Sequence, residues 1–182
     1  IAPLDFDEFD RHTTTATQDG VHLIGFSLGA MTALKIAAQR QKLITKLTLI
    51  APAAPLELGD FLPNMAGRSV FSAAKLGRIP FWAFTTIQRL GVSMAADKVM
   101  ETMFANSPEA DLRLLNNSDF KRTLLNGMKL AFGDGSRAYR NAVLSYVQPW
   151  ADTLARVNCP VEIHHGTTDT WAPLGMSQCL QR

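Results

Sequence analysis

Residues 21–50 contain a strand, a helix and a second strand in close succession, and this order constrains the fold more than any other feature. A short apolar run at residues 21–25 follows the turn signal Gln18-Asp19-Gly20. Residues 27–40 repeat an apolar face with helical spacing, and residues 44–50 form a second apolar strand. Two strands joined through one short helix lie parallel in a sheet, so the sequence predicts an α/β protein.

Composition supports a folded domain and excludes several classes of function. The 182 residues are 47% hydrophobic and 19% charged, which is enough apolar surface for a core. A net charge of +2 gives no reason to expect nucleic acid as a partner. Cys159 and Cys179 are too few and too far apart for a disulfide framework or a zinc site, so no metal is expected. The longest apolar stretch, at residues 43–58, is interrupted by polar residues and is too short to span a bilayer.

Glycine and proline residues, which interrupt helices and strands, divide the chain into three blocks. Residues 1–54 are predicted to hold the βαβ unit, preceded by a strand tail at residues 1–4 and an acidic loop. Residues 55–154 are predicted to be mostly helix, with repeated Gly, Pro and Asn-Ser breaks. Residues 155–182 are predicted to hold a strand at 159–166, a loop at 167–172 and a helix that begins at Pro173.

The pentapeptide Gly25-Phe26-Ser27-Leu28-Gly29 lies between the first predicted strand and its helix. A serine on such a sharp turn projects its hydroxyl clear of the sheet, and glycines on either side avoid collisions in the strained backbone. The N-terminus of the helix offers unpaired amides, so the Leu28 N–H is a candidate donor to an oxyanion. The alternative interpretation is a tight glycine turn that carries an uninvolved serine.

A second candidate lies in the loop after the third predicted strand. Asp169 follows His165-Gly166 just beyond the carboxyl end of that strand, where α/β sheets build their sites. The alternative is an aspartate that caps the helix at Pro173.

Together these segments resemble the α/β-hydrolase superfamily, in which a nucleophile, an acid and a histidine follow one another along the chain. The resemblance implies a partial α/β-hydrolase fold, with Ser27 as nucleophile and Asp169 as the acid that orients the histidine. It also implies that residues 55–154 are a helical cap and that no cofactor is used. The opening residues 1–11 resemble the segment after an early strand of the family, with acidic residues in place of its glycines.

The histidine that the resemblance requires is missing. None of His12, His22, His164 and His165 follows Asp169. His165 fits the strand end where the family uses a structural histidine, and His22 is expected to be a core residue. Outer strands and the loop that supplies the second oxyanion amide are missing as well, so we expect an incomplete chain that is poorly soluble or needs a partner.

The substrate is expected to be a small molecule with an apolar acyl group, because the middle block is rich in phenylalanine and methionine. An ordinary core between cap helices explains these residues better than a pocket lining does. Phe26 and Trp171 are the candidate pocket residues beside the serine and the acid. Basic residues outnumber acidic ones between Asp60 and Lys98, and a solvated helix face is favoured over membrane contact. The acidic start is not a signal peptide, but the chain does not begin with Met, so the compartment is left open with the cytoplasm weakly favoured. The oligomeric state stays open.

The leading functional prediction is a serine hydrolase that cleaves an ester or thioester through an acyl-enzyme. The same triad serves C–C bond hydrolysis, acyl transfer and cofactor-free peroxidase-like reactions, so these alternatives stay open. A non-catalytic or inactive fragment is the third alternative, because the histidine is absent.

Overall fold

A computed structural model of the chain describes residues 6–13 and 20–181, which form two compact units. The α/β unit comprises the described residues of Ile1–Phe61, Gln148–Thr167 and Ala172–Arg182. The helical unit comprises Leu62–Val147 together with Thr168–Trp171. The strand tail predicted at residues 1–4 lies outside the described residues.

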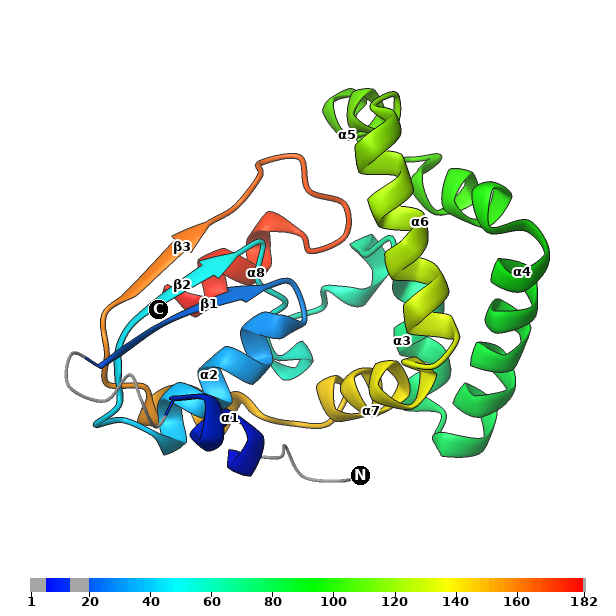
Figure 1. The fold of residues 1–182 in the computed structure, drawn as a ribbon. Helices are drawn as coiled ribbons and strands as arrows, with labels where there is room; N and C mark the ends of the chain where they lie inside the picture. The colour runs from blue at the N-terminus through cyan, green and yellow to red at the C-terminus, as the bar shows by residue number, and fades with distance from the viewer. Residues whose placement is uncertain (1–5, 14–19, 182) are drawn as a thin grey trace. The chain divides into compact units, whose positions relative to one another are not determined.

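Three parallel strands form the sheet of the α/β unit, in the order β1-β2-β3 (Figure 1). They are β1 (Val21–Phe26), β2 (Ile44–Ile50) and β3 (Val161–His164). Phe26 pairs with Ile50, and Ile50 pairs with His164, so the carboxyl ends of all three strands meet at one edge. The predicted α/β architecture with a parallel sheet is therefore confirmed.

The helix α2 (Gly29–Gln39) covers one face of this sheet. Its small and apolar side chains, including Ala30 and Ala33, are buried, which lets the helix lie close to the strands. On β2, Leu47 and Leu49 are 0% and 1% exposed. Burial of each leucine contributes about 2 kcal/mol, so this face holds the core of the unit.

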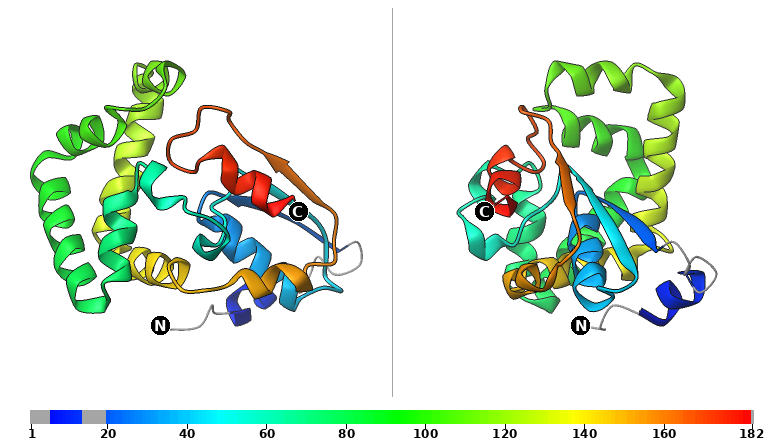
Figure 2. Two further views of the ribbon diagram at one scale, coloured as in Figure 1. Left: turned by 180° about the vertical axis from the view of Figure 1, so that it is seen from behind. Right: turned by 90° about the vertical axis from the view of Figure 1, so that its left-hand side faces the viewer.

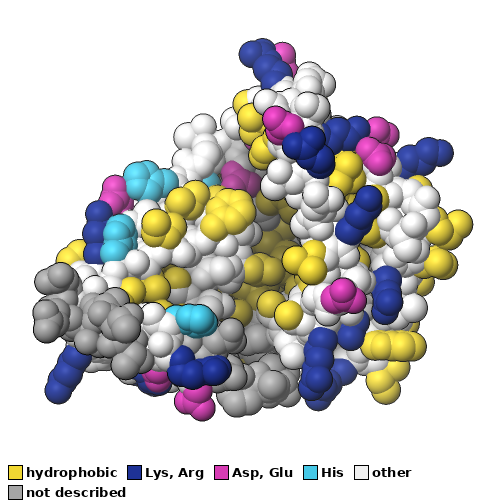
Figure 3. Space-filling model, viewed as in Figure 1, with side chains coloured by type: hydrophobic (Ala, Val, Ile, Leu, Met, Phe, Trp, Pro, Cys, Tyr) yellow, Lys and Arg dark blue, Asp and Glu magenta, His cyan; other side chains and the backbone are white. Residues whose placement is uncertain are grey.

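The opposite face of the sheet is uncovered. The side chains of Ile24 and Phe26 on β1 are 65% and 66% exposed, and yellow apolar side chains gather over the strands in Figure 3. The exposed His22 lies on β1 with its Nε2 2.9 Å from the Thr48 hydroxyl, which corrects the expectation of a core histidine. The reason is that no helix packs on this face among the described residues.

On β2 and β3, the same exposed face of the sheet carries charged side chains. Lys46 forms an ion pair with Glu162 at 2.8 Å, and His164 Nε2 lies 2.9 Å from the other Glu162 oxygen. The hydrogen bond from Lys46 lowers the pKa of the Glu162 carboxyl, and the charges of Lys46 and His164 act in the same direction.

A short helix, α1 (Phe6–Thr13), replaces the predicted acidic loop and contains His12. It is attached to the end of α2 by two hydrogen bonds from the Arg40 guanidinium to the Asp10 carboxylate, of 2.9 and 2.6 Å. The Arg40 guanidinium also lies 5.2 Å from the centroid of the Phe6 ring. These contacts explain why a segment with few apolar residues is helical. The unit is completed by η1 (Leu56–Leu58), η3 (Ala151–Arg156) and α8 (Leu174–Leu180).

The borders of the α/β unit differ from the predicted ones at residues 54 and 154. Pro52 and Pro55 are fully buried, so the chain stays within this unit as far as Phe61. The Glu57 carboxylate accepts the backbone N–H groups of Trp150 and Ala151, both at 2.6 Å, and thereby holds the start of η3. A glutamate that caps a helix distant in sequence leaves no local signal, which is why the prediction missed it.

The helical unit contains five helices and one short turn (Figure 2). They are η2 (Leu62–Asn64), α3 (Arg68–Lys75), α4 (Arg78–Phe104), α5 (Glu109–Leu115), α6 (Ser118–Phe132) and α7 (Ser136–Tyr146). Met100 on α4 packs with Met128 and Phe132 on α6, so many of its methionines and phenylalanines form an ordinary core. Within this core, burial raises the pKa of Tyr139 to about 12.

The longest helix of this unit is not continuous. Ala95 has φ −154° and ψ 56°, which breaks α4 into two segments. The break follows Gly91 and Ser93, and the Ser93 hydroxyl donates to the Leu90 carbonyl at 2.8 Å. No helix in the described ranges 6–13 and 20–181 has the length and apolar content needed to cross a membrane.

Candidate active site

Ser27 occupies a strained turn between β1 and α2. Its φ is 52°, a value that side-chain-bearing residues rarely adopt. The Ser27 N–H donates to the Ile50 carbonyl at 3.0 Å, and the Ser27 carbonyl accepts the N–H groups of Ala30 and Ala53 at 3.1 and 3.2 Å. These bonds fix the serine at the carboxyl edge of the sheet, and they sustain a backbone conformation that costs of order 1–3 kcal/mol.

The two glycines beside this turn have different roles. A Cβ on Gly25 would lie 2.8 Å from the Ala30 Cα and 2.9 Å from the Ala33 Cβ, so only glycine lets α2 approach β1 this closely. A Cβ on Gly29 would meet no atom within 4 Å, and its φ is not in the positive range. The expectation that side chains would collide on both sides of Ser27 is therefore wrong for Gly29, because the first turn of α2 points it into open space.

Two polar groups at the turn, the Leu28 N–H and the Ser27 hydroxyl, are not hydrogen-bonded to any described residue. Within the described residues, the Leu28 N–H has no hydrogen-bond partner, although the Leu28 carbonyl accepts from Met31 at 3.2 Å. The Ser27 hydroxyl likewise has no partner in this part of the chain. A hydroxyl beside a free amide at a helix N-terminus has the chemistry needed to attack a carbonyl and to hold the resulting oxyanion.

Asp169 lies in the Thr168–Trp171 segment, which groups with the helical unit. One of its carboxylate oxygens accepts the Trp171 backbone N–H at 2.8 Å, a turn within the loop. The Thr170 carbonyl accepts the Ala66 N–H at 2.8 Å and so ties this loop to the residues before α3. Because Ser27 belongs to the other unit, a pairing of Asp169 with the serine stays a prediction.

Three of the four histidines are engaged away from Ser27. His165 Nδ1 is bonded to the buried Ser177 hydroxyl, and its Nε2 donates to the Ala172 carbonyl at 2.7 Å. The Nδ1 atom therefore connects the end of β3 to α8, and the Nε2 atom connects it to the loop before α8, which is a structural role. His22 and His164 have their Nε2 atoms bonded to Thr48 and Glu162 on the uncovered sheet face.

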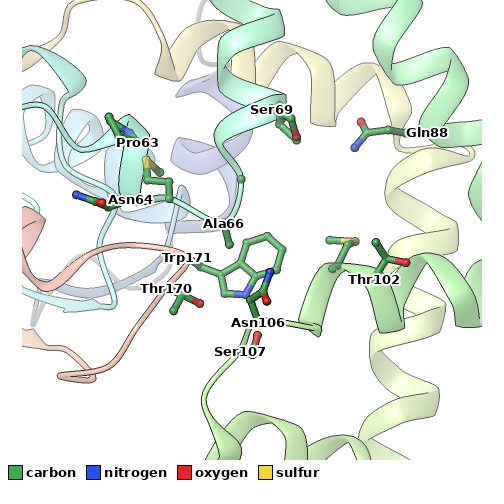
Figure 4. Close-up of a pocket in the computed structure, with 14 residues that line it drawn as sticks. Pro63, Asn64, Ala66, Ser69, Gln88, Thr102, Asn106, Ser107, Thr170 and Trp171 are labelled. Atoms are coloured by element: carbon green, nitrogen blue, oxygen red, sulfur yellow. The ribbon is translucent and has the colours of Figure 1, made fainter.

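The candidate pocket residues Phe26 and Trp171 have different environments. Phe26 is 66% exposed at the end of β1. Trp171 lines a cavity of about 460 Å³ in the helical unit and packs against Phe104, with 5.8 Å between the ring centroids. In Figure 4 its indole ring lies among the other lining residues, with Thr170 beside it, while Gln88 projects from α4 at a greater distance.

Sequence reasoning missed one feature beside the serine. Ala51, the residue after β2, has φ 43°, and its N–H donates to the His164 carbonyl at 2.8 Å. Two neighbouring strands thus both end in left-handed backbone, at Ser27 and at Ala51. Alanine does not favour this conformation, so no local signal predicts it; the pairing with β3 imposes it.

Comparisons with known proteins agree with this architecture. The sequence model of the alpha/beta hydrolase family matches residues 2–180. Two solved structures share the fold. The first is MGS-M2, an alpha/beta hydrolase enzyme from a Medee basin deep-sea metagenome library, with 16% sequence identity and a TM-score of 0.50. The second is an alpha/beta fold family hydrolase from Bacillus anthracis str. Sterne, with 16% sequence identity and a TM-score of 0.56.

Each comparison covers 96% of the present chain. It covers only 57% of the MGS-M2 chain and 60% of the Bacillus anthracis chain, so the sequence spans less than two thirds of either length. No curated protein matched the sequence.

Proposed function

The chain belongs to the alpha/beta hydrolase family, and on that premise we propose that it carries the nucleophile of a serine hydrolase that cleaves esters or thioesters. The observation that carries the proposal is the left-handed backbone of Ser27, with φ 52°, between β1 and α2. A serine in this conformation raises the free energy of the folded chain, and such strained residues cluster at active sites, where they position a nucleophile.

In the proposed reaction the Ser27 Oγ attacks the acyl carbon of the substrate, and its proton passes to a general base. The carbonyl oxygen becomes an oxyanion, which the Leu28 N–H stabilises. Collapse of this intermediate breaks the bond to the alcohol or thiol, which leaves with the proton from the base. Water then attacks the acyl-enzyme in the same manner and releases the carboxylic acid.

The base is proposed to be a histidine outside this 182-residue sequence, oriented by Asp169. Support comes from the bonds that hold His22, His164 and His165, none of which joins Ser27. The Trp171 N–H holds one oxygen of Asp169 at 2.8 Å, which fixes the carboxylate for such a role. The helical unit is proposed to be the cap, and the substrate a small molecule with an apolar acyl group.

A small external base tests the proposal on the chain as it stands. Imidazole replaces a missing histidine, so it is expected to raise the rate of p-nitrophenyl butyrate hydrolysis by residues 1–182. The matched control is Ser27→Ala, which reveals the background that imidazole itself produces. We expect at least a tenfold excess over that background.

Equal rates with Ser27 and Ser27→Ala, in chains with the same melting temperature, would favour a non-catalytic member of the family instead. The observation that favours this second candidate is that the Ser27 hydroxyl has no hydrogen-bond partner among the described residues. If the ester is attacked but an added amine or thiol captures the acyl group in place of water, acyl transfer is the better description of the chemistry.

A further inference from the structure

The N-terminal half of α4 carries a row of exposed apolar side chains, the α4 stripe. Ile79, Ile87, Leu90 and Met94 are 82%, 72%, 59% and 77% exposed, and the exposed Ala83 lies between the first two. Successive members are three or four residues apart, so all five lie on one face of the helix. Figure 3, viewed as in Figure 1, shows yellow apolar side chains over α4.

The opposite face of α4 belongs to the core of the helical unit. Phe81, Thr85 and Val92 are buried there. The Phe81 ring packs against Tyr139 on α7, with 6.4 Å between the ring centroids. The α4 stripe is therefore not needed for packing within this unit. A solvated helix face, which the sequence favoured, would carry polar side chains, and contiguous exposed apolar surface marks an interaction site instead.

Three arginines lie beside one end of the α4 stripe. Together with Ile79 and Trp82 they line a hollow of about 380 Å³ between α4 and α7: Arg78 belongs to α4, and Arg137 and Arg140 belong to α7. Among the described residues none of the three arginines has an ion-pair partner. Guanidinium groups bind phosphate oxygens strongly, so this hollow fits an anionic phosphate group.

The charge around the stripe decides between the possible partners. Residues 61–96 contain four basic residues and no acidic one. A second copy of the chain would bring two surfaces of the same charge together, whereas a surface of anionic lipids carries the opposite charge. Trp82, which is 58% exposed, adds an amphipathic ring of the kind that favours the boundary between lipid tails and head groups.

We propose that α4 docks the helical unit onto a membrane surface that contains anionic lipids. The α4 stripe enters the apolar layer, as the apolar face of an interfacial helix does, and the helix lies in the plane of the membrane. Arg78, Arg137 and Arg140 bind the phosphates of the lipid head groups. This surface lies in the helical unit and does not depend on a reaction at Ser27.

Flotation with lipid vesicles tests the proposal. The Ser27→Ala chain is used, so the proposed hydrolysis cannot alter the lipids, and failure of the chemistry at Ser27 leaves the test unaffected. It is mixed with vesicles of phosphatidylcholine, or of phosphatidylcholine and phosphatidylglycerol in equal amounts. Binding to the anionic vesicles should be about tenfold tighter or more, and added salt should weaken it because salt screens the attraction.

Substitutions separate the apolar and the basic contributions. Ile87→Gln, on the α4 stripe, should weaken binding to anionic vesicles about tenfold, because a polar side chain replaces one that enters the apolar layer. Replacement of Arg137 and Arg140 together by Gln should cost about tenfold on anionic vesicles only. Ile24→Thr is the matched control: it removes an exposed apolar side chain from the sheet face and should leave binding unchanged. Equal melting temperatures of the variants establish that the fold is intact.

Tryptophan fluorescence reports which surface enters the lipid. Bromine atoms on the acyl chains quench only a tryptophan that reaches the apolar layer. Anionic vesicles of this kind should quench Trp82, and the quenching should be lost in Trp82→Phe. The emission of Trp150 and Trp171 should stay unchanged, because Trp150 is buried in the α/β unit and Trp171 is not on the α4 stripe.

Equal binding to neutral and anionic vesicles would overturn the proposal, and so would unchanged binding of a folded Ile87→Gln chain. A chain that does not float but forms a dimer, lost in Ile87→Gln, would assign the stripe to a second copy. Polyglutamate that binds more tightly than the anionic vesicles, and equally well to Ile87→Gln, would assign the basic hollow to an acidic protein. Either result would contradict docking on lipid.

Discussion

The turn at Ser27 depends on the missing side chain of the neighbouring Gly25. Gly25 has no Cβ, and this absence lets Ala30 and Ala33 approach β1, which brings the start of α2 directly behind the serine. The Leu28 N–H has no partner among the described residues, because Leu28 precedes the first turn of α2. Residue-scale sterics thus place a hydroxyl and an amide side by side.

Replacing either glycine by alanine tests this account directly. Gly25→Ala is expected to destabilise the chain by about 1–3 kcal/mol, because its methyl group would overlap backbone and side-chain atoms of α2. Gly29→Ala meets open space in a helix and should be neutral or stabilising by up to about 1 kcal/mol. Urea unfolding of the two variants gives the comparison. Equal destabilisation by both would show that close packing does not explain the glycine at position 25.

At the scale of elements, the pair between α1 and α2 makes one attachment pH-dependent. The hydrogen bond from Arg40 lowers the pKa of Asp10; burial acts in the opposite direction, and the Arg40 charge lowers the pKa further. A carboxyl whose pKa is lowered on folding contributes stability above its unfolded value and loses that contribution as the pH falls through the folded value. We therefore expect α1 to separate from α2 in acid before the sheet unfolds.

Hydrogen exchange of the α1 amides measures this separation. Their protection should be high at pH 6 and should fall between about pH 4 and pH 2, in a window set by the carboxyl. Asp10→Asn should show low protection in α1 already at pH 6. The control Glu109→Gln removes the exposed pair with Arg113 on α5 and should leave α1 unchanged. Protection in α1 that is the same at both pH values, or unaffected by Asp10→Asn, would contradict the role of the pair.

The sequence predicted some elements well because their signals are local. The strand at residues 44–50 has the predicted bounds, since its apolar run ends at Pro52. The helix predicted at residues 27–40 begins at Gly29, because Ser27 and Leu28 form the turn instead. The strand predicted at residues 159–166 is limited to Val161–His164, the four residues that pair with β2. Pairing across the sheet, rather than composition, decides where such an edge strand ends.

The candidate site divides in the same way. The glycine pattern predicted the turn at Ser27, because the backbone conformation there depends on residues that are adjacent in the sequence. The positive φ of Ala51 and the Trp171 Nε1 atom without a partner among the described residues depend on contacts with segments distant in sequence, so no local pattern predicts them. The role of Asp169 requires the relation between two units and stays a prediction.

For the whole molecule, the uncovered sheet face is the feature with the largest consequence. Ile24, Phe26 and Ile50 are 65%, 66% and 39% exposed, and the strand pairing places them on one face of the sheet. Figure 3 shows apolar side chains gathered over the strands. Contiguous apolar surface of this kind marks an interface or an aggregation site. The expectation of poor solubility, made from the sequence, applies to this face.

A single substitution on that face tests the expectation. Ile24→Thr keeps a β-branched residue on the strand while removing exposed apolar area, so it should reduce self-association with little change in the unfolding midpoint. Leu49→Thr, on the covered face, should cost more than about 2 kcal/mol and is the contrasting variant. Light scattering after gel filtration over a range of concentrations is the measurement. A wild-type chain that stays monomeric throughout would rule out this role for the face.

The central claim is that Ser27 is a reactive nucleophile, and active-site labelling tests it most directly. The folded chain is treated with a fluorophosphonate in the presence of imidazole, and the adduct is located by peptide mass spectrometry. We predict one adduct, on Ser27, that is lost in Ser27→Ala and retained in Ser93→Ala, a variant of an exposed serine on α4. An adduct elsewhere, or no adduct on a chain that melts cooperatively, would contradict the claim.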